Sequence, residues 1–143
     1  MLTCTRRLEF DYGHRVFKHE SKCRHLHGHR GVVEVTALAD ELDSLGRIID
    51  FSVLKHKVGT WIDEHWDHNM ILFKDDVEAI KAVESVREGK SPFVSDWNPT
   101  AENLAKYLLE VVCPKVLQGT GVKIVKVRFW ETPNGIAEAE LGS

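Results

Sequence analysis

Imidazole side chains are concentrated between residues 14 and 29, where five of the eight histidines lie. Within this stretch, every second position from 23 to 29 carries a side chain that can bind metal or exchange a proton: Cys23, His25, His27 and His29. Side chains at positions i and i+2 of an extended strand point to the same face. The spacing therefore predicts a metal-binding face, with a solvated histidine-rich loop as the alternative.

His27 and His29 form a His-x-His pair, which a strand would present as a clamp of two nitrogen ligands. Neutral imidazole nitrogen is a suitable ligand for zinc. His14 could supply a third nitrogen if its strand pairs with the strand that follows the clamp. Three histidines leave the fourth position of tetrahedral zinc open for water or substrate, which is typical of catalytic sites.

Three nearby or distant residues are candidates for proton transfer. Cys23 would share the face of His27, where a metal cation and imidazoles would stabilise its thiolate as a general base or nucleophile. It could instead be a fourth zinc ligand, which would close the site, or an ordinary buried thiol. Asp67 precedes His68 and could orient or charge its imidazole, although such pairs are also common at turns.

Glu131 stands out because it continues the inward face of an otherwise apolar strand. Val125, Val127 and Phe129 are expected to precede it on that face. A carboxylate in such a place is costly unless it meets a partner. The partner could be a ring edge with two adjacent hydrogen-bond donors, or a structural salt bridge.

The elements that position these residues can be predicted from periodicity. Alternation of apolar and polar residues predicts four strands, at residues 3–10, 31–39, 122–131 and 136–141. Helical spacing predicts two amphipathic helices, which begin at Asp50 or Ser52 and at Thr100, the expected N-cap of the second. Residues 74–90 are charged and predict only a short helix or an insertion. The order is typical of an α+β fold, an antiparallel four-stranded sheet with two helices on one face.

Length and composition limit the class of protein. A chain of 143 residues, 43% hydrophobic and 29% charged, is typical of one soluble globular domain spanning residues 1–143. The net charge of −3 and the lack of a Lys/Arg stripe favour a small-molecule or protein partner over nucleic acid. No apolar run is long enough for a signal peptide or a membrane span, and the three cysteines form no disulfide framework. We therefore expect a cytoplasmic protein.

The candidate residues described above, taken in their order along the chain, resemble those of the 6-pyruvoyltetrahydropterin synthase and 6-carboxytetrahydropterin synthase family, the tunnelling-fold pterin enzymes. The resemblance covers nearly the whole chain and rests on six segments: residues 10–14, 23–29, 46–51, 66–69, 98–103 and 131–132. Residues 23–29, which read Cys-x-x-Leu-His-Gly-His with a histidine upstream, are highly specific. The other segments are weak singly and strong in this order.

The resemblance implies a tunnelling fold (T-fold) and a zinc ion held by three histidines: His14, His27 and His29. Cys23 would be the base, and Asp67 with His68, contributed by a neighbouring subunit, would complete a proton-transfer triad. Glu131 would bind the pterin through its 2-amino and N3 groups, with Thr100 assisting. The implied assembly is a homohexamer of two stacked trimers, in which the sheets of each trimer close a barrel and the sites lie at interfaces.

Three residues separate Cys23 from His27, a spacing that resembles the bacterial 6-carboxytetrahydropterin synthases of the queuosine and 7-deazapurine pathway. The resemblance thus implies a carbon–carbon lyase that converts 7,8-dihydroneopterin triphosphate to 6-carboxytetrahydropterin, with release of acetaldehyde and triphosphate. Two alternatives remain: a pyruvoyl-type synthase that only eliminates triphosphate, and a zinc- and pterin-binding oligomer without turnover. The presence of Cys23, Asp67 and His68 together argues against the binder, which needs no proton shuttle.

Overall fold

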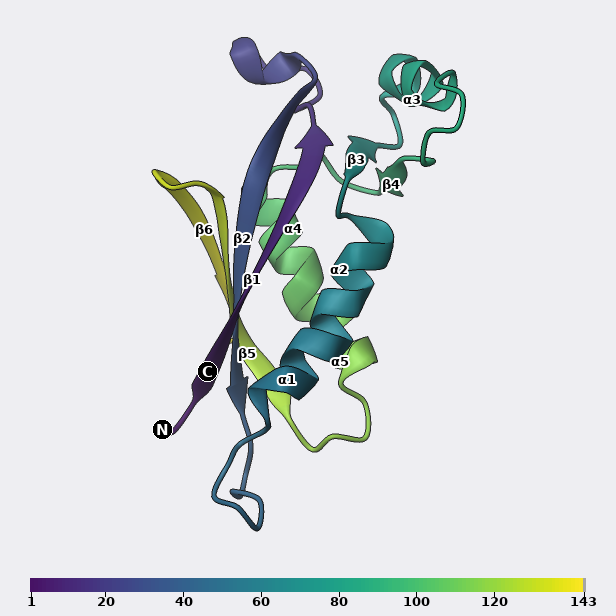
Figure 1. Ribbon diagram of the computed structural model, residues 1–143. Helices are drawn as coiled ribbons and strands as arrows, with labels where there is room; N and C mark the ends of the chain where they lie inside the picture. Colours follow the sequence, from purple (N-terminus) through teal and green to yellow (C-terminus); the bar gives the residue numbers. More distant parts are fainter. Residues whose placement is uncertain (143) are drawn as a thin grey trace.

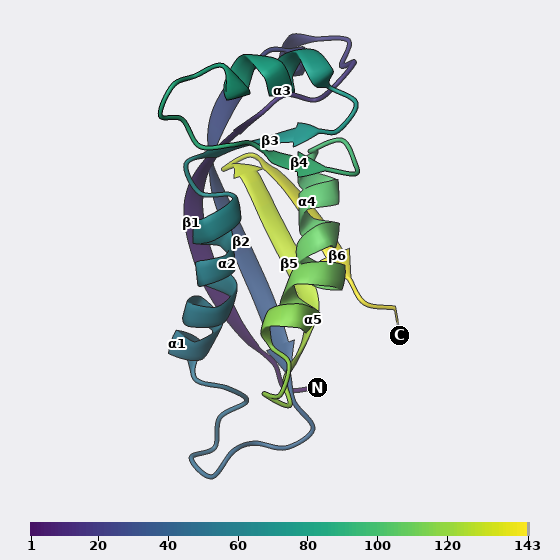
Figure 2. The same cartoon turned by 90° about the vertical axis from the view of Figure 1, so that its right-hand side faces the viewer.

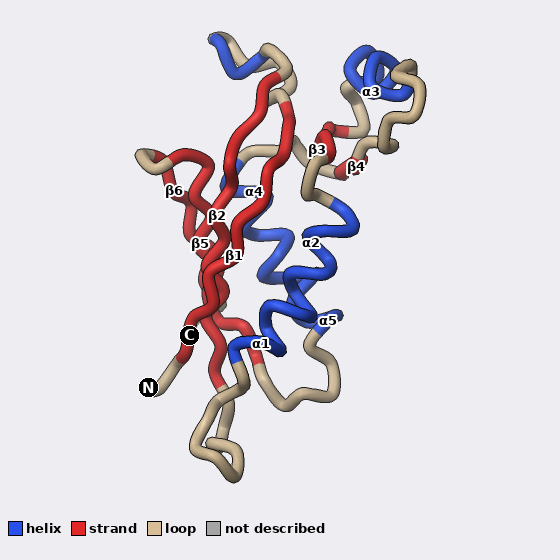
Figure 3. Tube along the Cα trace, in the orientation of Figure 1, coloured by secondary structure: helices blue, strands red, loops and turns tan. Residues whose placement is uncertain are grey.

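A computed structural model describes residues 1–142, which form one mixed sheet with a layer of helices on one face (Figure 1, Figure 3). The strands are β1 (Cys4–His14), β2 (His27–Leu38), β3 (Asn69–Phe73), β4 (Phe93–Ser95), β5 (Lys123–Thr132) and β6 (Gly135–Glu140). They lie in the order β4-β3-β1-β2-β5-β6. Strands β1, β2, β5 and β6 pair antiparallel, whereas β3 runs parallel to both β1 and β4.

The long β1–β2 hairpin is the part of the sheet that positions the histidines. Its register runs from Cys4 opposite Ala37 to His14 opposite His27. The strands predicted at residues 3–10 and 31–39 are confirmed, but both extend further toward the tip of the hairpin. The tip itself holds a short 3-10 turn, η1 (Lys22–Arg24).

Two long helical runs form the second layer. The first comprises α1 (Phe51–Leu54), a π-helical stretch η2 (Lys55–Gly59) and α2 (Thr60–His65), and the second comprises α4 (Ala101–Tyr107), a π-helical stretch η3 (Leu108–Val112) and α5 (Cys113–Val116). The Asp50 carboxylate accepts a hydrogen bond from the Ser52 amide, and the Thr100 hydroxyl accepts one from the Asn103 amide, so both act as N-caps as expected. No helix within residues 1–142 has the length and apolar composition to cross a membrane.

The two helical runs lie side by side against β1, β2 and β5 (Figure 2). Their apolar faces join the inward residues of these strands in one buried cluster. At its centre the Phe10 ring lies 6.1 Å from the ring of Trp66 and 6.0 Å from that of Phe129, measured between centroids. Burial of this apolar surface fixes which face of the β1–β2 hairpin is turned toward the helices.

The expected four-stranded antiparallel sheet is wrong in strand number and in type. The four predicted strands are present, but β3 and β4 extend the sheet beside β1, and α3 (Val77–Glu84) lies between them in the chain. Strands of five and three residues are too short to show a period of their own. The buried carboxylate of Asp76 caps α3 and pairs with the Arg15 guanidinium, which ties this segment to the hairpin.

Two irregularities in β5 decide which of its side chains face inward. In the pairing with β2, Thr36 lies opposite Lys126 but Ala37 opposite Ile124, so Val125 is an extra residue. Val127 and Phe129 are buried as expected. The expectation that Val125 also faces inward is wrong, because the bulge places Ile124 in the core instead. A second shift, in the pairing of β5 with β6, falls between Trp130 and Thr132, at Glu131.

Candidate functional site

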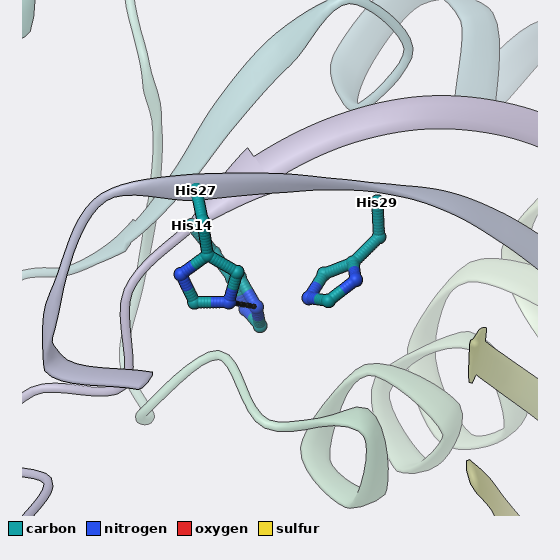
Figure 4. Close-up of side chains that lie close together, drawn as sticks. All are labelled: His14, His27 and His29. Carbon is teal, nitrogen blue, oxygen red and sulfur yellow. Dashed lines mark hydrogen bonds between the residues drawn. The ribbon is translucent and has the colours of Figure 1, made fainter. Parts of the chain in front are cut away.

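Three imidazoles converge at the tip end of the β1–β2 hairpin, on the side of the helices (Figure 4). His14 is opposite His27 in the strand pairing, and His29 is two residues further along β2. Their ring centroids are 4.6 to 5.1 Å apart, and one nitrogen from each lies within 4.8 Å of the other two. The predicted grouping of His14, His27 and His29 is confirmed as geometry.

Backbone carbonyls set the tautomers of two of these rings. Nδ1 of His14 lies 2.7 Å from the carbonyl oxygen of Pro99, and Nδ1 of His27 lies 2.6 Å from that of His25. A carbonyl oxygen only accepts, so each Nδ1 donates and each neutral ring keeps a lone pair on Nε2. The two Nε2 atoms are 3.1 Å apart. Two lone pairs facing at this distance require a proton or a metal ion between them.

Electrostatics favour a metal ion over a proton. The pKa of His14 is lowered to about 4, mainly by burial and also by the positive charges that His27 and His29 would carry, while the hydrogen bond to Pro99 acts to raise it. Burial also lowers the pKa of His29. The rings of His14 and His29 are therefore neutral at pH 7. Glu131 Oε1 lies 3.4 Å from Nε2 of His14 and 3.6 Å from Nε2 of His29, so a carboxylate faces two uncharged nitrogens.

The donor set fits zinc. Zinc–nitrogen bonds of 2.0–2.1 Å at tetrahedral angles put ligand nitrogens about 3.4 Å apart, close to the 3.1 Å between the Nε2 atoms of His14 and His27. Nε2 of His29 is buried without a hydrogen-bond partner among the described residues. Hydrogen bonds from Nδ1 to carbonyl oxygens are also the usual outer-shell support of metal-bound histidine.

The expectation that Cys23 and His25 share this face is wrong. Strand β2 begins only at His27, and Cys23 lies in the 3-10 turn η1, where alternation of side chains does not apply. Cys23 is half-buried and does not join the histidine group within residues 1–142. Its carbonyl oxygen accepts from the Val16 amide at 2.9 Å, while His25 acts through its carbonyl on His27.

Asp67 and His68 form a second group, together with Asp11. His68 Nδ1 lies 2.9 Å from Asp67 Oδ2, and Asp67 Oδ1 accepts a hydrogen bond of 3.0 Å from the Asp11 amide. The His68 amide donates to the Asp11 carbonyl at 2.7 Å, which holds His68 in the left-handed region at φ 54°. Burial acts to raise the pKa of Asp67, but the hydrogen bonds from Asp11 and His68 and the charges of His68 and Lys90 lower it overall.

One cavity adjoins both groups of residues. Its volume is about 800 Å³, and His27, His29 and His68 all contribute to its wall. The segment that follows β3 closes another side with Val83 and Lys90. Part of the charged stretch 74–90, whose role the sequence leaves open, therefore lines the space next to His27 and His29.

Thr100 is connected to the site through Pro99, the residue before it, which contacts His14. Its hydroxyl caps α4 by accepting the Asn103 amide at 3.2 Å, and Pro99, the preceding residue, orients His14. Sequence patterns gave no signal for Pro99, because a backbone carbonyl leaves no mark in residue type.

Sequence patterns also missed Tyr12, whose buried ring lies 5.3 Å from that of His14 and 5.6 Å from that of His29. Burial, and then the charge of Glu131, raise the pKa of Tyr12.

Comparison with known proteins identifies the class of this α+β chain. Residues 3–141 match the family model described as 6-pyruvoyl tetrahydropterin synthase, and the chain belongs to that family of enzymes. Its sequence is 42% identical to that of a Rickettsia felis protein named 6-carboxy-5,6,7,8-tetrahydropterin synthase, over 96% of this chain and 99% of that protein. It is 33% identical to an Aquifex aeolicus protein of the same name, over 90% and 91% of the two chains.

Solved structures share the fold of this chain. An uncharacterised protein from Wolinella succinogenes superposes with a TM-score of 0.80 at 29% identity and covers 99% of this chain and 98% of its own. The Caenorhabditis elegans 6-pyruvoyl tetrahydropterin synthase gives a TM-score of 0.69 at 23% identity, over 99% and 96% of the chains, and bears on the fold alone. The family resemblance seen in the sequence is confirmed by the family model and by the relatives of 33% and 42% identity.

Proposed function

We propose that this protein is a zinc-dependent 6-carboxy-5,6,7,8-tetrahydropterin synthase. It would convert 7,8-dihydroneopterin triphosphate and water to 6-carboxytetrahydropterin, acetaldehyde and triphosphate, as a carbon–carbon lyase. The observation that carries the proposal is the convergence of three Nε2 atoms beside a carboxylate, in a chain 42% identical over nearly its whole length to a protein of that name.

The zinc ligands would be His14, His27 and His29. When bound, zinc would supply a Lewis acid that polarises side-chain hydroxyls of the substrate. The protein's own contribution is to fix the rings: the Pro99 and His25 carbonyls hold the tautomers that leave Nε2 free.

Proton transfer would be the task of Cys23, Asp67 and His68. Asp67 orients His68 through a 2.9 Å contact, and the His68 ring is exposed at the wall of the cavity. Within residues 1–142 of one chain Cys23 does not join the group of Asp11, Asp67 and His68. We therefore assign the completed triad to the contact between neighbouring subunits of a homohexamer, a dimer of trimers.

Glu131 and Thr100 would hold the pterin. The half-buried Glu131 carboxylate can accept two hydrogen bonds, from the 2-amino group and N3 of the ring. The Thr100 hydroxyl oxygen is already engaged with the Asn103 amide, but its own hydrogen remains available as a donor. We further infer a cytoplasmic enzyme that acts on the route to 7-deazapurines such as queuosine.

A shared site can be tested by mixing variants. Cys23→Ala and His68→Ala are each expected to be inactive. If a site takes Cys23 from one subunit and His68 from another, dissociation and reassembly of an equal mixture should restore about a quarter of the wild-type activity. No recovery in mixed hexamers would place both residues of a working site in one chain.

The reaction itself is tested by mass spectrometry of the products formed from 7,8-dihydroneopterin triphosphate by zinc-loaded protein, with a parallel assay for acetaldehyde. We expect 6-carboxytetrahydropterin and acetaldehyde. A pyruvoyl product without acetaldehyde would favour the second candidate, a 6-pyruvoyltetrahydropterin synthase, which the description of the family model supports. Binding of zinc and pterin without turnover would leave the non-catalytic binder.

A further inference from the structure

The hydroxyl group of Tyr12 is buried without a partner. The residue is 3% exposed, and its oxygen has no hydrogen-bond partner among the described residues. Buried tyrosine hydroxyls usually find one. His29, directly opposite Tyr12 in the strand pairing, also carries a buried unpaired polar atom, Nε2. Two buried polar atoms without a partner therefore belong to one residue pair of the hairpin, Tyr12 and His29, and His29 is itself one of the three clustered histidines.

The Tyr12 ring extends from β1 across β2 toward β5. A Cβ atom on Gly31 of β2 would come within 3.0 Å of Tyr12 Cε1, so the ring passes over a position that only glycine leaves free. Its centroid lies 5.7 Å from that of Phe129, although β2 separates β1 from β5. The phenol end is therefore directed to the part of β5 where Glu131 follows Phe129 by two residues.

We propose that the Tyr12 hydroxyl is a substrate-binding group that donates a hydrogen bond to an oxygen of the ligand held between the three histidines and Glu131. A phenol is protonated at neutral pH and can donate. The inference rests on the proposed function, because it takes the ligand to be a pterin. On that ring the two donors assigned to Glu131, the 2-amino group and N3, are followed by the 4-carbonyl oxygen. This acceptor is the partner that the geometry assigns to Tyr12.

The test is the affinity of zinc-loaded protein for neopterin, measured by fluorescence titration, for the wild type and for Tyr12→Phe. A hydrogen bond of ordinary net strength predicts that the variant binds roughly threefold to tenfold more weakly. Tyr107→Phe is the matched control, since Tyr107 is the other tyrosine of the chain and packs on Trp97 at 5.2 Å between ring centroids. Its affinity for neopterin should equal that of the wild type.

A second readout separates binding from structure. Tyr12→Phe removes a buried, unpaired hydroxyl and keeps the ring, so its unfolding midpoint should equal or exceed that of the wild type, with unchanged zinc content. A lower midpoint or lost zinc would overturn the proposal in favour of a structural role. Equal neopterin affinity in wild type and variant would overturn it while leaving the proposed function intact. Failure of the wild type to bind neopterin would overturn both.

Discussion

Replacing His27 with glutamine should weaken zinc binding far more than the same change at His25. The two residues have the same side chain and lie two positions apart. Nε2 of His27 faces Nε2 of His14 at 3.1 Å, whereas His25 acts through its backbone carbonyl, which glutamine also supplies. Both variants have the same amino-acid composition, so a difference in zinc affinity between them shows which of the two histidines is a ligand.

The size of the effect follows from the number of ligands. The apparent free energy of zinc binding to sites in small proteins is about 10–16 kcal/mol, or roughly 2.5–4 kcal/mol for each of four ligands. At about 1.4 kcal/mol per factor of ten, loss of one ligand weakens binding by roughly 100-fold to 1,000-fold. His27→Gln should show this loss, and His25→Gln should bind zinc as the wild type does.

Competition with a chromophoric zinc chelator at pH 7 measures these affinities, with circular dichroism to verify that each variant is folded. Equal loss of zinc affinity in both variants would rule out this ligand set, since His25 would then be a ligand or the loop as a whole would bind the metal. Wild-type affinity in His27→Gln would rule out the ligand set as well.

Three further predictions concern Cys23, pH and the Asp76 ion pair. Cys23→Ala should abolish turnover but keep zinc affinity, because Cys23 lies outside the histidine group; loss of zinc on chelator competition would contradict this. The metal-free protein should lose stability on the order of 3 kcal/mol as the pH falls from 6.5 toward 4, because the pKa of His14 is lowered to about 4 in the folded state and the unfolded chain takes up the proton first. Urea unfolding should show a flatter pH dependence in His14→Gln, and equal slopes would count against the buried neutral ring. Asp76→Asn should lower the free energy of unfolding by about 3 kcal/mol, because it leaves the Arg15 guanidinium without its buried partner; an unchanged urea midpoint would argue against this role.

The antiparallel part of the fold could be predicted because its elements are long enough to show a period. Strands β1, β2 and β5 are each ten residues or longer and alternate over part of that length, and Asp50 and Thr100 are N-caps by residue type. Strands β3 and β4 depend on pairing with β1 and with each other, which no local pattern reports. Val125 was assigned to the wrong face because the strand was assumed to be free of bulges.

The grouping of His14, His27 and His29 could be predicted because two strand positions and one pairing determine it. The same alternation failed for Cys23, since it was extended beyond the start of β2 into a 3-10 turn. Tyr12 lies just beyond the strand predicted at residues 3–10, and only the structure reveals that its buried hydroxyl has no partner among the described residues. Contacts through backbone carbonyls, such as that of Pro99 with His14, lie beyond any reading of residue types.

In the proposed site, three histidines hold a zinc ion whose fourth position stays open. Zinc K-edge X-ray absorption of the loaded protein tests it most directly. We predict nitrogen or oxygen neighbours at about 2.0–2.1 Å, with the outer-shell scattering of three imidazoles and no sulfur. A sulfur neighbour at about 2.3 Å would make Cys23 a ligand and close the site, and would contradict the account.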